Sequence, residues 1–327
     1  MKKNSAGFSI LIMVAAAIII NPFTASYYQS MQLEEVPAAK MTDSLYSEIA
    51  EKSKLYEAVP QDAEIHKIWK ATPGYNGVKV DVEASYQRMK QGGIFDENLL
   101  VFKQIPPKVH LKDLPASPIY RGNPEKPMVS FLINVAWGNE YIPKMLDTLD
   151  KYHVKATFFL EGRWVKENTE LAKMISDSGH EVGNHSYSHP DMSRLSSNAI
   201  MNELQRTNEV IEAATGKKPD WFGPPSGSYR DEVTSAARSL QMGMVLWSVD
   251  TIDWQKPSPD VLFARVMKKV HNGAMILMHP TDATEKSLEK LILSIKKKGL
   301  SIGTVSSLMN EERLIREPAV LRKQDQQ

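Results

Sequence analysis

The sequence has 327 residues and a formal net charge of +1, which leaves room for one large α/β domain or two smaller ones. A charge this close to neutral argues against a nucleic-acid partner. The chain has no cysteine, so disulfides and thiolate metal sites are excluded, while the redox compartment stays undecided.

The N-terminus predicts export. Lys2 and Lys3 precede an apolar run from Phe8 to Ile20, and small residues continue to Ser26. Residues 1–26 therefore read as a secretory signal peptide, with an uncleaved anchor as the alternative. The run is shorter than the roughly 20 residues that span a bilayer. In either case we expect the body of the protein to be extracytoplasmic, secreted or tethered to the membrane at the cell envelope.

The next segments predict a spacer and a small domain. Residues 27–63 are polar, with a helix expected near 41–57, and form a spacer. Residues 64–114 are expected to form a small α+β domain. Its predicted elements are a strand at 78–82, a helix at 84–90 and a strand at 99–102. Residues 115–127 are rich in Pro and Gly, which indicates a linker.

Strands and helices alternate through residues 128–310, and a polar tail follows at 311–327. Strands are predicted at 129–133, 156–160, 181–184, 221–222, 244–249, 275–278 and 301–304. Helices are predicted at 141–152, 171–178, 197–215, 231–240, 262–271 and 285–298. This alternation predicts a parallel sheet curled into a distorted (β/α) barrel. In such barrels the active face lies at the carboxyl ends of the strands.

One motif suggests a metal site on that face. His185-Ser186-Tyr187-Ser188-His189 follows a predicted strand, and its two histidines are four residues apart. Two imidazoles at this spacing can bind one divalent ion. A hydrolase of this type needs a third ligand, usually a carboxylate. The alternative is a pair of ordinary histidines held by hydrogen bonds.

Four stretches together resemble the polysaccharide deacetylase family of metal-dependent carbohydrate esterases. These enzymes remove N-acetyl groups from chitin-like and peptidoglycan sugars. The stretches are Val154–Gly162, Gly179–His189, Asp250–Trp254 and Ile276–His279, in the family's order. The resemblance covers about Met128 to Leu308. More loosely, the segment from Glu64 resembles a module that precedes some such deacetylases.

The resemblance implies a set of roles. His185 and His189 would hold a divalent metal, zinc or similar, with a carboxylate from the first strand. His279 would be the catalytic acid, tuned by Asp253. Pro224, Pro225 and Trp254 would line the groove for N-acetylated envelope glycan.

The base side of this pattern is substituted. Alignment on Tyr141-Ile142-Pro143 puts Asn134 at the position of the base and Val135 at that of the third metal ligand. An amide has no basic lone pair, and a valine side chain has no donor atom. Gly223 stands where the family has an arginine that orients the base. These losses are coupled, because that arginine would be an unpaired charge beside a neutral asparagine.

Three hypotheses follow. The first is a deacetylase-family hydrolase with weak or rearranged catalysis, in which Glu140, Asp191 or Asp282 replaces the lost ligand. The second is a non-catalytic protein that binds glycan or a partner at the envelope. The third is a structural role in an extracytoplasmic assembly, with the segment that starts near Glu64 as the interaction surface. Metal content separates them, because two neutral histidines make a poor site.

Overall fold

The computed structural model describes residues 43–315, which form two compact units. One comprises residues 43–55 and 80–101, and the other comprises 56–79 and 102–315. This division runs through the predicted small domain at 64–114, so the domain boundaries stay a prediction. The apolar run Phe8–Ile20 lies outside the described residues. Between residues 43 and 315, no helix is long and apolar enough to cross a membrane.

The first unit is built on two helices, α4 (Ser44–Ser53) and α5 (Val82–Met89). Asp43 caps α4 by accepting the N–H of Leu45 at 2.9 Å. The same carboxylate accepts the hydroxyl of Tyr86 from α5 at 2.6 Å. Tyr46 packs edge-on against Tyr86, with ring centroids 5.5 Å apart. One carboxylate and one aromatic pair therefore join the helices. Short 3₁₀ turns follow them, η1 (Lys54–Tyr56) and η2 (Glu97–Leu99).

The second unit begins with two small two-stranded sheets, β1-β2 and β3-β4. Strand β1 (Glu64–His66) pairs antiparallel with β2 (Lys70–Thr72), and β3 (Gly77–Val80) pairs with β4 (Phe102–Ile105). A 3₁₀ turn, η3 (Leu111–Asp113), follows. The predicted strand at 99–102 is wrong in position. Asp96 accepts the N–H of Asn98 and starts the turn η2, so the strand begins only at Phe102.

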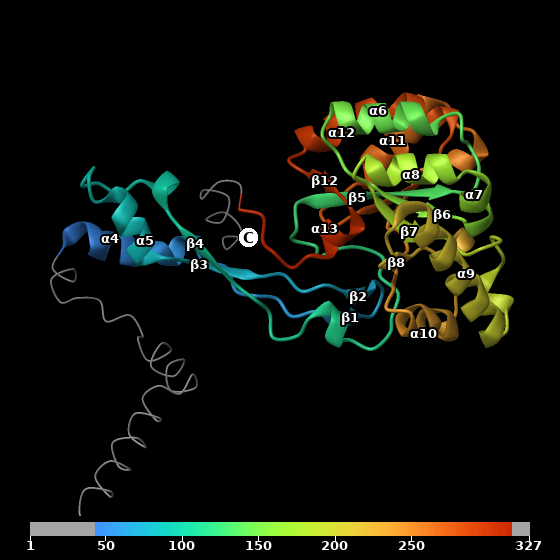
Figure 1. The fold of residues 1–327 in the computed structure, drawn as a ribbon. Helices are drawn as coiled ribbons and strands as arrows, with labels where there is room; N and C mark the ends of the chain where they lie inside the picture. Colours follow the sequence, from blue (N-terminus) through green and yellow to red (C-terminus); the bar gives the residue numbers. More distant parts are fainter. Residues whose placement is uncertain (1–42, 316–327) are drawn as a thin grey trace, which may run out of the picture. The chain divides into compact units, whose positions relative to one another are not determined.

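A parallel sheet forms the body of the second unit (Figure 1). Its strand order is β10-β11-β5-β6-β7-β8-β9, and β12 also pairs with β5. The prediction of a parallel sheet curled into a distorted barrel is confirmed. The strands are β5 (Met128–Val135), β6 (Thr157–Leu160), β7 (Glu181–Asn184), β8 (Trp221–Phe222), β9 (Gly243–Met244), β10 (Val249–Asp250), β11 (Met275–Met278) and β12 (Ser301–Gly303).

Helices follow the strands, and most lie where the hydrophobic periodicity predicts them. Ser196 caps α9, and Gly216 ends it in a left-handed conformation. Helices α11 and α12 begin three residues earlier than predicted, because Ser258 and Thr281 supply the N-caps. The helices are α6 (Ile142–Lys151), α7 (Gly162–Glu167), α8 (Thr169–Asp177), α9 (Ser197–Thr215), α10 (Asp231–Ser239), α11 (Pro259–Lys269), α12 (Asp282–Lys297) and α13 (Val305–Met309), with 3₁₀ turns η4 (Met192–Arg194), η5 (Pro225–Gly227) and η6 (Asp253–Gln255).

The predicted single strand at 244–249 is wrong. The chain forms two strands there, β9 and β10, which stand at opposite ends of the strand order. Between them, the N–H of Leu246 donates to the carbonyl of Ile119 at 2.8 Å, and Ile119 donates to Met244 at 3.0 Å. Residue Ile119 belongs to the predicted linker 115–127, which here pairs alongside β9. Because Met244 and Leu246 form these hydrogen bonds with Ile119, the strand does not continue beside β8. The chain pairs instead with β11, from Val249 onwards.

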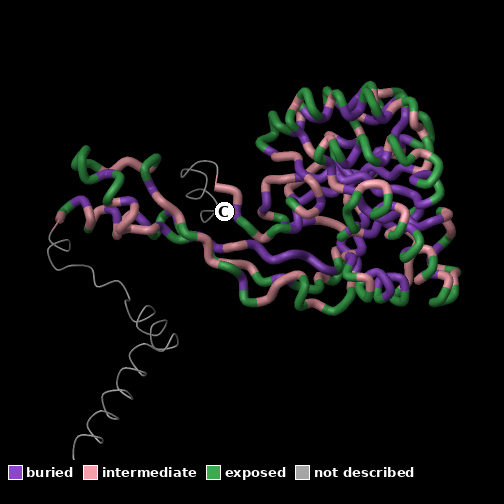
Figure 2. Tube along the Cα trace, viewed as in Figure 1, coloured by how far each residue is buried: buried purple, intermediate pink, exposed green. Residues whose placement is uncertain are grey.

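Strand β5 lies at the centre of the core and is buried along almost its whole length (Figure 2). Its alternate residues Val129, Phe131, Ile133 and Val135 join one apolar cluster with residues of helices α6, α8, α11 and α12. Residue Leu132 points the other way, into a second cluster inside the barrel. Burying each large side chain contributes about 1.5–3 kcal/mol. The period of two along β5 therefore divides core-facing from barrel-facing positions.

His180 is a buried histidine of this core. Its ring lies 5.2 Å from that of Phe158, and its Nδ1 accepts the N–H of Ala156 at 3.2 Å. Burial lowers the pKa of His180 from 6.5 to about 4. The residue is therefore neutral and structural at neutral pH.

We expect His180 to make the fold acid-labile. Its pKa is lower in the folded than in the unfolded state, so the unfolded state binds more protons between pH 6.5 and 4. The free energy of unfolding should therefore fall as the pH is lowered from 6.5 to 4. In His180→Asn the amide oxygen can still accept from Ala156, but nothing titrates. Urea unfolding across this range should show the wild type losing about 2–3 kcal/mol relative to the variant. Parallel pH profiles would contradict this role.

Candidate functional site

A cleft of about 500 Å³ opens at the carboxyl ends of the barrel strands. Parallel strands bring these ends to one edge, so the residues that follow different strands meet there. The cleft gathers most of the predicted site residues. Its lining comprises Asn134, Ala136, Trp137, His185, His189, Ser226, Trp247, Asp250, Trp254, Leu277 and His279.

The loop that carries the two histidines is held from α9. Glu203 accepts the backbone N–H groups of Tyr187 and Ser188, each at 2.8 Å, and the Ser188 hydroxyl at 2.8 Å. Ser186 and His189 have φ angles of +63° and +55°, and such backbone strain in non-glycine residues concentrates at functional sites. The sequence analysis did not identify Glu203, because it lies one helix away from the motif that it holds.

The histidines are prepared to act as neutral lone-pair donors. Nδ1 of the buried His185 lies 2.6 Å from the carbonyl of Gly223, to which it donates, so Nε2 carries the lone pair. The His185 and His189 ring centroids are 5.1 Å apart. Burial lowers the pKa of His185 to about 3 and lowers that of His189. Both imidazoles are therefore uncharged at neutral pH, as a metal ligand must be.

Asp253 and His279 form the pair that the family resemblance implies. One oxygen of the fully buried Asp253 accepts from Nδ1 of His279 at 2.8 Å. The other accepts the backbone N–H of His279 at 2.6 Å and the hydroxyl of Thr284 at 2.7 Å. The imidazole is thereby fixed in orientation, and its Nε2 is left for a group in the cleft.

The base side of the cleft lacks a carboxylate at both predicted positions. Asn134 lines the cleft, while Val135 is fully buried in the helix-facing apolar cluster. Among residues 43–315, no group of three or more His, Asp or Glu side chains is placed to hold a metal ion. The described residues therefore provide two imidazoles without the third ligand of a catalytic site.

The suggestion that another carboxylate replaces the lost ligand is wrong for the described residues. Asp191 accepts hydrogen bonds from Ser193 and from the hydroxyl of Ser228. Asp282 pairs with Lys286 at 2.6 Å. Glu140 lines an adjoining cavity rather than the histidine cleft. None of these three carboxylates lines the histidine cleft.

The segment at Gly223, where the resemblance places an arginine, differs from the family pattern in shape as well as in charge. A Cβ atom added at Gly223 would lie 3.0 Å from the ring of Phe159, so an arginine here would require that ring to shift. Pro224 and Pro225, predicted to line the groove, are buried. Their neighbour Ser226, with a φ of +54°, lines the cleft in their place.

Aromatic side chains form much of the remaining wall. Trp254, which the resemblance places in the groove, lines the cleft with 57% of its surface exposed. Trp137 and Trp247 also line it and were missed. For Trp137 the available signal was its position directly after a buried strand. Asp250 lines the cleft and caps its own turn, accepting the N–H of Ile252 at 2.8 Å.

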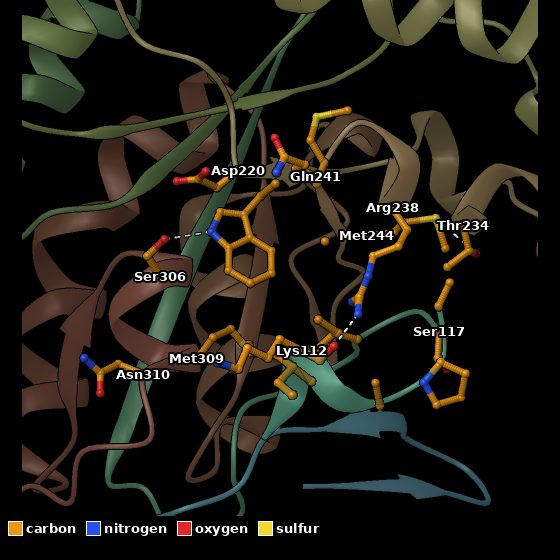
Figure 3. Close-up of a pocket in the computed structure, with 18 residues that line it drawn as sticks. Lys112, Ser117, Asp220, Thr234, Arg238, Gln241, Met244, Ser306, Met309 and Asn310 are labelled. Carbon is orange, nitrogen blue, oxygen red and sulfur yellow. Dashed lines mark hydrogen bonds between the residues drawn. The ribbon is translucent and has the colours of Figure 1, made fainter. Parts of the chain in front are cut away.

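A second cavity, of about 410 Å³, lies at the amino ends of β8 and β9 (Figure 3). Two of the polar side chains around it donate hydrogen bonds to other parts of the chain. Trp221 donates from Nε1 to the Ser306 hydroxyl at 2.8 Å, and Arg238 donates to the carbonyl of Lys112. In barrels this end serves stability rather than chemistry. The histidine cleft is therefore the candidate functional site.

Sequence comparisons identify relatives for this arrangement. The family model for polysaccharide deacetylase matches residues 121–245. The uncharacterized protein YlxY of Bacillus subtilis is 56% identical over 309 residues, which cover 94% of this chain and 97% of that protein. The peptidoglycan-N-acetylmuramic acid deacetylase PdaA of Bacillus subtilis is 32% identical over 200 residues, covering 60% of this chain and 76% of that enzyme.

Solved structures give a similar result. Wild-type BA3943 of Bacillus anthracis, described as a CE4 family pseudoenzyme, is 57% identical, with a TM-score of 0.80. The match covers 83% of this chain and 97% of that one. A BA3943 mutant described as having restored enzymatic activity matches with the same TM-score and identity, over 83% of this chain and 100% of that one.

The Asp253–His279 pair predicts a tautomer. In the wild type Asp253 accepts from Nδ1, so neutral His279 should carry its proton there. In Asp253→Asn, the amide oxygen should keep the bonds to Thr284 and the backbone, leaving NH₂ to face Nδ1. The proton should then move to Nε2. Long-range ¹⁵N NMR of the ring nitrogens measures this change. Thr284→Val is the control, and Nδ1 protonation persisting in Asp253→Asn would refute the assignment.

Proposed function

Because the chain belongs to the polysaccharide deacetylase family, we propose that it binds N-acetylated envelope glycan in the histidine cleft and hydrolyses little or none of it. The observation that carries this proposal is the composition of the cleft. Asn134 and Val135 stand where the resemblance requires a base and a metal ligand, and the described residues contain no group of three His, Asp or Glu side chains that could hold a metal.

Amide hydrolysis sets requirements that this cleft meets only in part. A base must take a proton from water, and an electrophile must stabilise charge on the tetrahedral intermediate. Asn134 cannot act as the base. His185 and His189 without a carboxylate do not fit a catalytic divalent metal, which normally has three protein ligands. No hydrolytic step through a metal is therefore assigned to this chain.

The same residues are suited to binding. Asn134 offers a carbonyl and an NH₂ group to an acetamide, and His185 and His189 offer neutral imidazoles. His279, fixed by Asp253, can hydrogen-bond to a sugar through Nε2. Tryptophans supply flat apolar surface for the faces of sugar rings. A site that fixes a glycan without activating water is a recognition site.

Weak hydrolysis is the second candidate, and one observation favours it. The acid side of the cleft is complete, because Asp253 and His279 are paired at 2.8 Å and oriented by further hydrogen bonds. A related pseudoenzyme frame can carry chemistry, since a BA3943 mutant is described as having restored enzymatic activity. This comparison supports an intact scaffold in the present chain. It does not identify a residue that could act as the base in place of Asn134.

We further propose an extracytoplasmic location, with the protein secreted or tethered at the envelope. The apolar run after Lys2 and Lys3 supports export. Relatives named as peptidoglycan deacetylases support a glycan partner outside the cytoplasm. A membrane tether and the identity of the glycan belong to this proposal.

Metal content and acetate release test the non-catalytic function. Two neutral imidazoles should hold zinc weakly, so the purified protein should carry well under one equivalent of zinc after dialysis. It should release little acetate from N-acetylglucosamine oligomers even when zinc is added, and calorimetry should detect binding of the same oligomers. Mass spectrometry of metal content and enzymatic assay of acetate give the readouts. Stoichiometric zinc with multiple-turnover acetate release would establish the hydrolase instead.

Restoring both carboxylates tests the alignment of β5. In Asn134→Asp/Val135→Asp, one carboxylate enters the apolar cluster around Val135, which should destabilise the apo protein by several kcal/mol. Zinc at about 100 times its dissociation constant should then raise the Tm by about 5–10 °C, because a ligand of the native state stabilises it.

Asn134→Asp/Val135→Asn is the matched control, and zinc should leave its Tm unchanged. Adding Gly223→Arg tests the orienting position, although the ring of Phe159 must shift to admit the side chain. If zinc does not stabilise the double-aspartate variant, then Val135 does not occupy the ligand position.

A further inference from the structure

Two neighbouring helices, α11 and α12, end in exposed lysines on the side of the barrel away from the histidine cleft. The helices pack against each other. Their last turns lead into β11 at Met275 and β12 at Ser301, so both ends lie at the amino ends of strands. The cleft lies at the carboxyl ends. We name these lysines the basic end, and they are Lys268, Lys269, Lys296, Lys297 and Lys298.

Attraction to the helix dipole explains only part of the basic end. A lysine near a helix C-terminus is stabilised by the carbonyl groups that end the helix. Nζ of Lys298 donates to the carbonyl of Met267 at 3.2 Å, and Nζ of Lys296 donates to that of Tyr152 at 2.7 Å. The other lysines of the basic end are exposed and form no ion pair with a carboxylate of residues 43–315. Their charge is therefore available to a partner.

The turn between β1 and β2 lies beside the basic end. The ring of Trp69, in this turn, has its centroid 6.4 Å from that of His271, which follows Lys269 by two residues. The guanidinium carbon of Arg121 lies 4.7 Å from the centroid of the same indole. The turn is therefore held against the segment that leads from α11 into β11, and the two features belong to one surface.

The turn presents an apolar side chain between two positive charges. Nδ1 of His66 accepts the backbone N–H of Ile68 at 3.1 Å, which fixes the backbone of the turn. Ile68 is 68% exposed, and Lys67 and Lys70 are exposed on either side of it. Within the same hairpin, Ile65 is 45% exposed. Removing these isoleucines from water would be favourable.

Lysines around exposed isoleucines match the interface of an anionic bilayer. Each lysine near an anionic leaflet strengthens binding about fivefold, and an apolar side chain gains free energy on entering the headgroup region. A stable protein partner normally needs about 800 Å² on each side, with an apolar centre. The turn offers only Ile65 and Ile68 for such a centre. A soluble polyanion would use the lysines and leave the isoleucines in water.

We propose that the basic end and the turn between β1 and β2 together form a docking surface for an anionic lipid leaflet. The docked barrel would turn its strand amino ends to the membrane, so the histidine cleft would open away from it. The proposal goes beyond the proposed glycan-binding function and does not depend on it, because no residue of this surface lines the cleft.

A fluorescent reporter at Ile68 tests the docking surface. The chain has no cysteine, so Ile68→Cys in the full chain can be labelled at one site with nitrobenzoxadiazole. Phosphatidylcholine vesicles that contain phosphatidylglycerol should raise the emission and shift it to shorter wavelength, because the dye leaves water. Vesicles of phosphatidylcholine alone should not, and high salt should reverse the change by screening the lysines. Insertion of the run Phe8–Ile20 alone would leave this dye in water.

Val261→Cys is the matched control for position, because Val261 is 50% exposed at the opposite end of α11. Its dye should remain in water with both kinds of vesicle. Charge is tested in the Ile68→Cys chain. Lys268→Gln/Lys297→Gln should weaken docking about 25-fold and remove most of the emission change. The control Lys144→Gln/Lys173→Gln, which removes two exposed lysines from α6 and α8, should retain it.

Three results would overturn the docking surface. The first is an unchanged emission at position 68 with phosphatidylglycerol present. The second is an equal change with phosphatidylcholine alone or at position 261, since contact would then depend neither on charge nor on this face. The third is a full emission change in Lys268→Gln/Lys297→Gln, which would exclude the basic end. None of these results bears on glycan binding, which is measured separately.

Discussion

The alternation of side chains along β5 is the constraint on which both the core and the cleft depend. Pairing with β6, β11 and β12 fixes this strand, so successive residues must face opposite sides. Asn134 consequently opens on the cleft, while Val135 is buried with the helices. A carboxylate at residue 135 would have to be held at the edge of an apolar cluster. In this chain Val135 packs in the apolar core, and among the described residues no third metal ligand accompanies His185 and His189.

Burial and hydrogen bonding then determine what the remaining polar groups can do. His185 is neutral because it is enclosed, and its bond to Gly223 selects the nitrogen that carries the lone pair. Asp253 is buried as well, yet three hydrogen bonds from His279 and Thr284 satisfy it. The result is a set of donors and acceptors held in fixed orientations around the cleft.

The loops around the cleft show that rigidity extends beyond the motif residues. Ser186, His189, Ser226 and Ile252 all have positive φ angles in non-glycine residues, a conformation that the surrounding structure must maintain. Gly138 meets Pro280 so closely that no side chain fits. Such backbone constraints place tryptophan surface at the mouth of the cleft. The walls of the cleft therefore have a defined arrangement that does not depend on Asn134 or Val135.

The sequence alone was sufficient to predict the alternating strands and helices, the barrel and the local motifs. Hydrophobic periodicity and capping residues act over only a few positions, so a local pattern reveals them. The helix at 197–215 and the strands at 181–184 and 275–278 were predicted to the residue. The split of 244–249 into two strands was not, because it depends on pairing with Ile119. Likewise, only the tertiary structure decided that Glu140, Asp191 and Asp282 lie outside the histidine cleft, and that Trp137 stacks on His279. These outcomes rest on contacts between segments far apart in the chain, which no local pattern encodes.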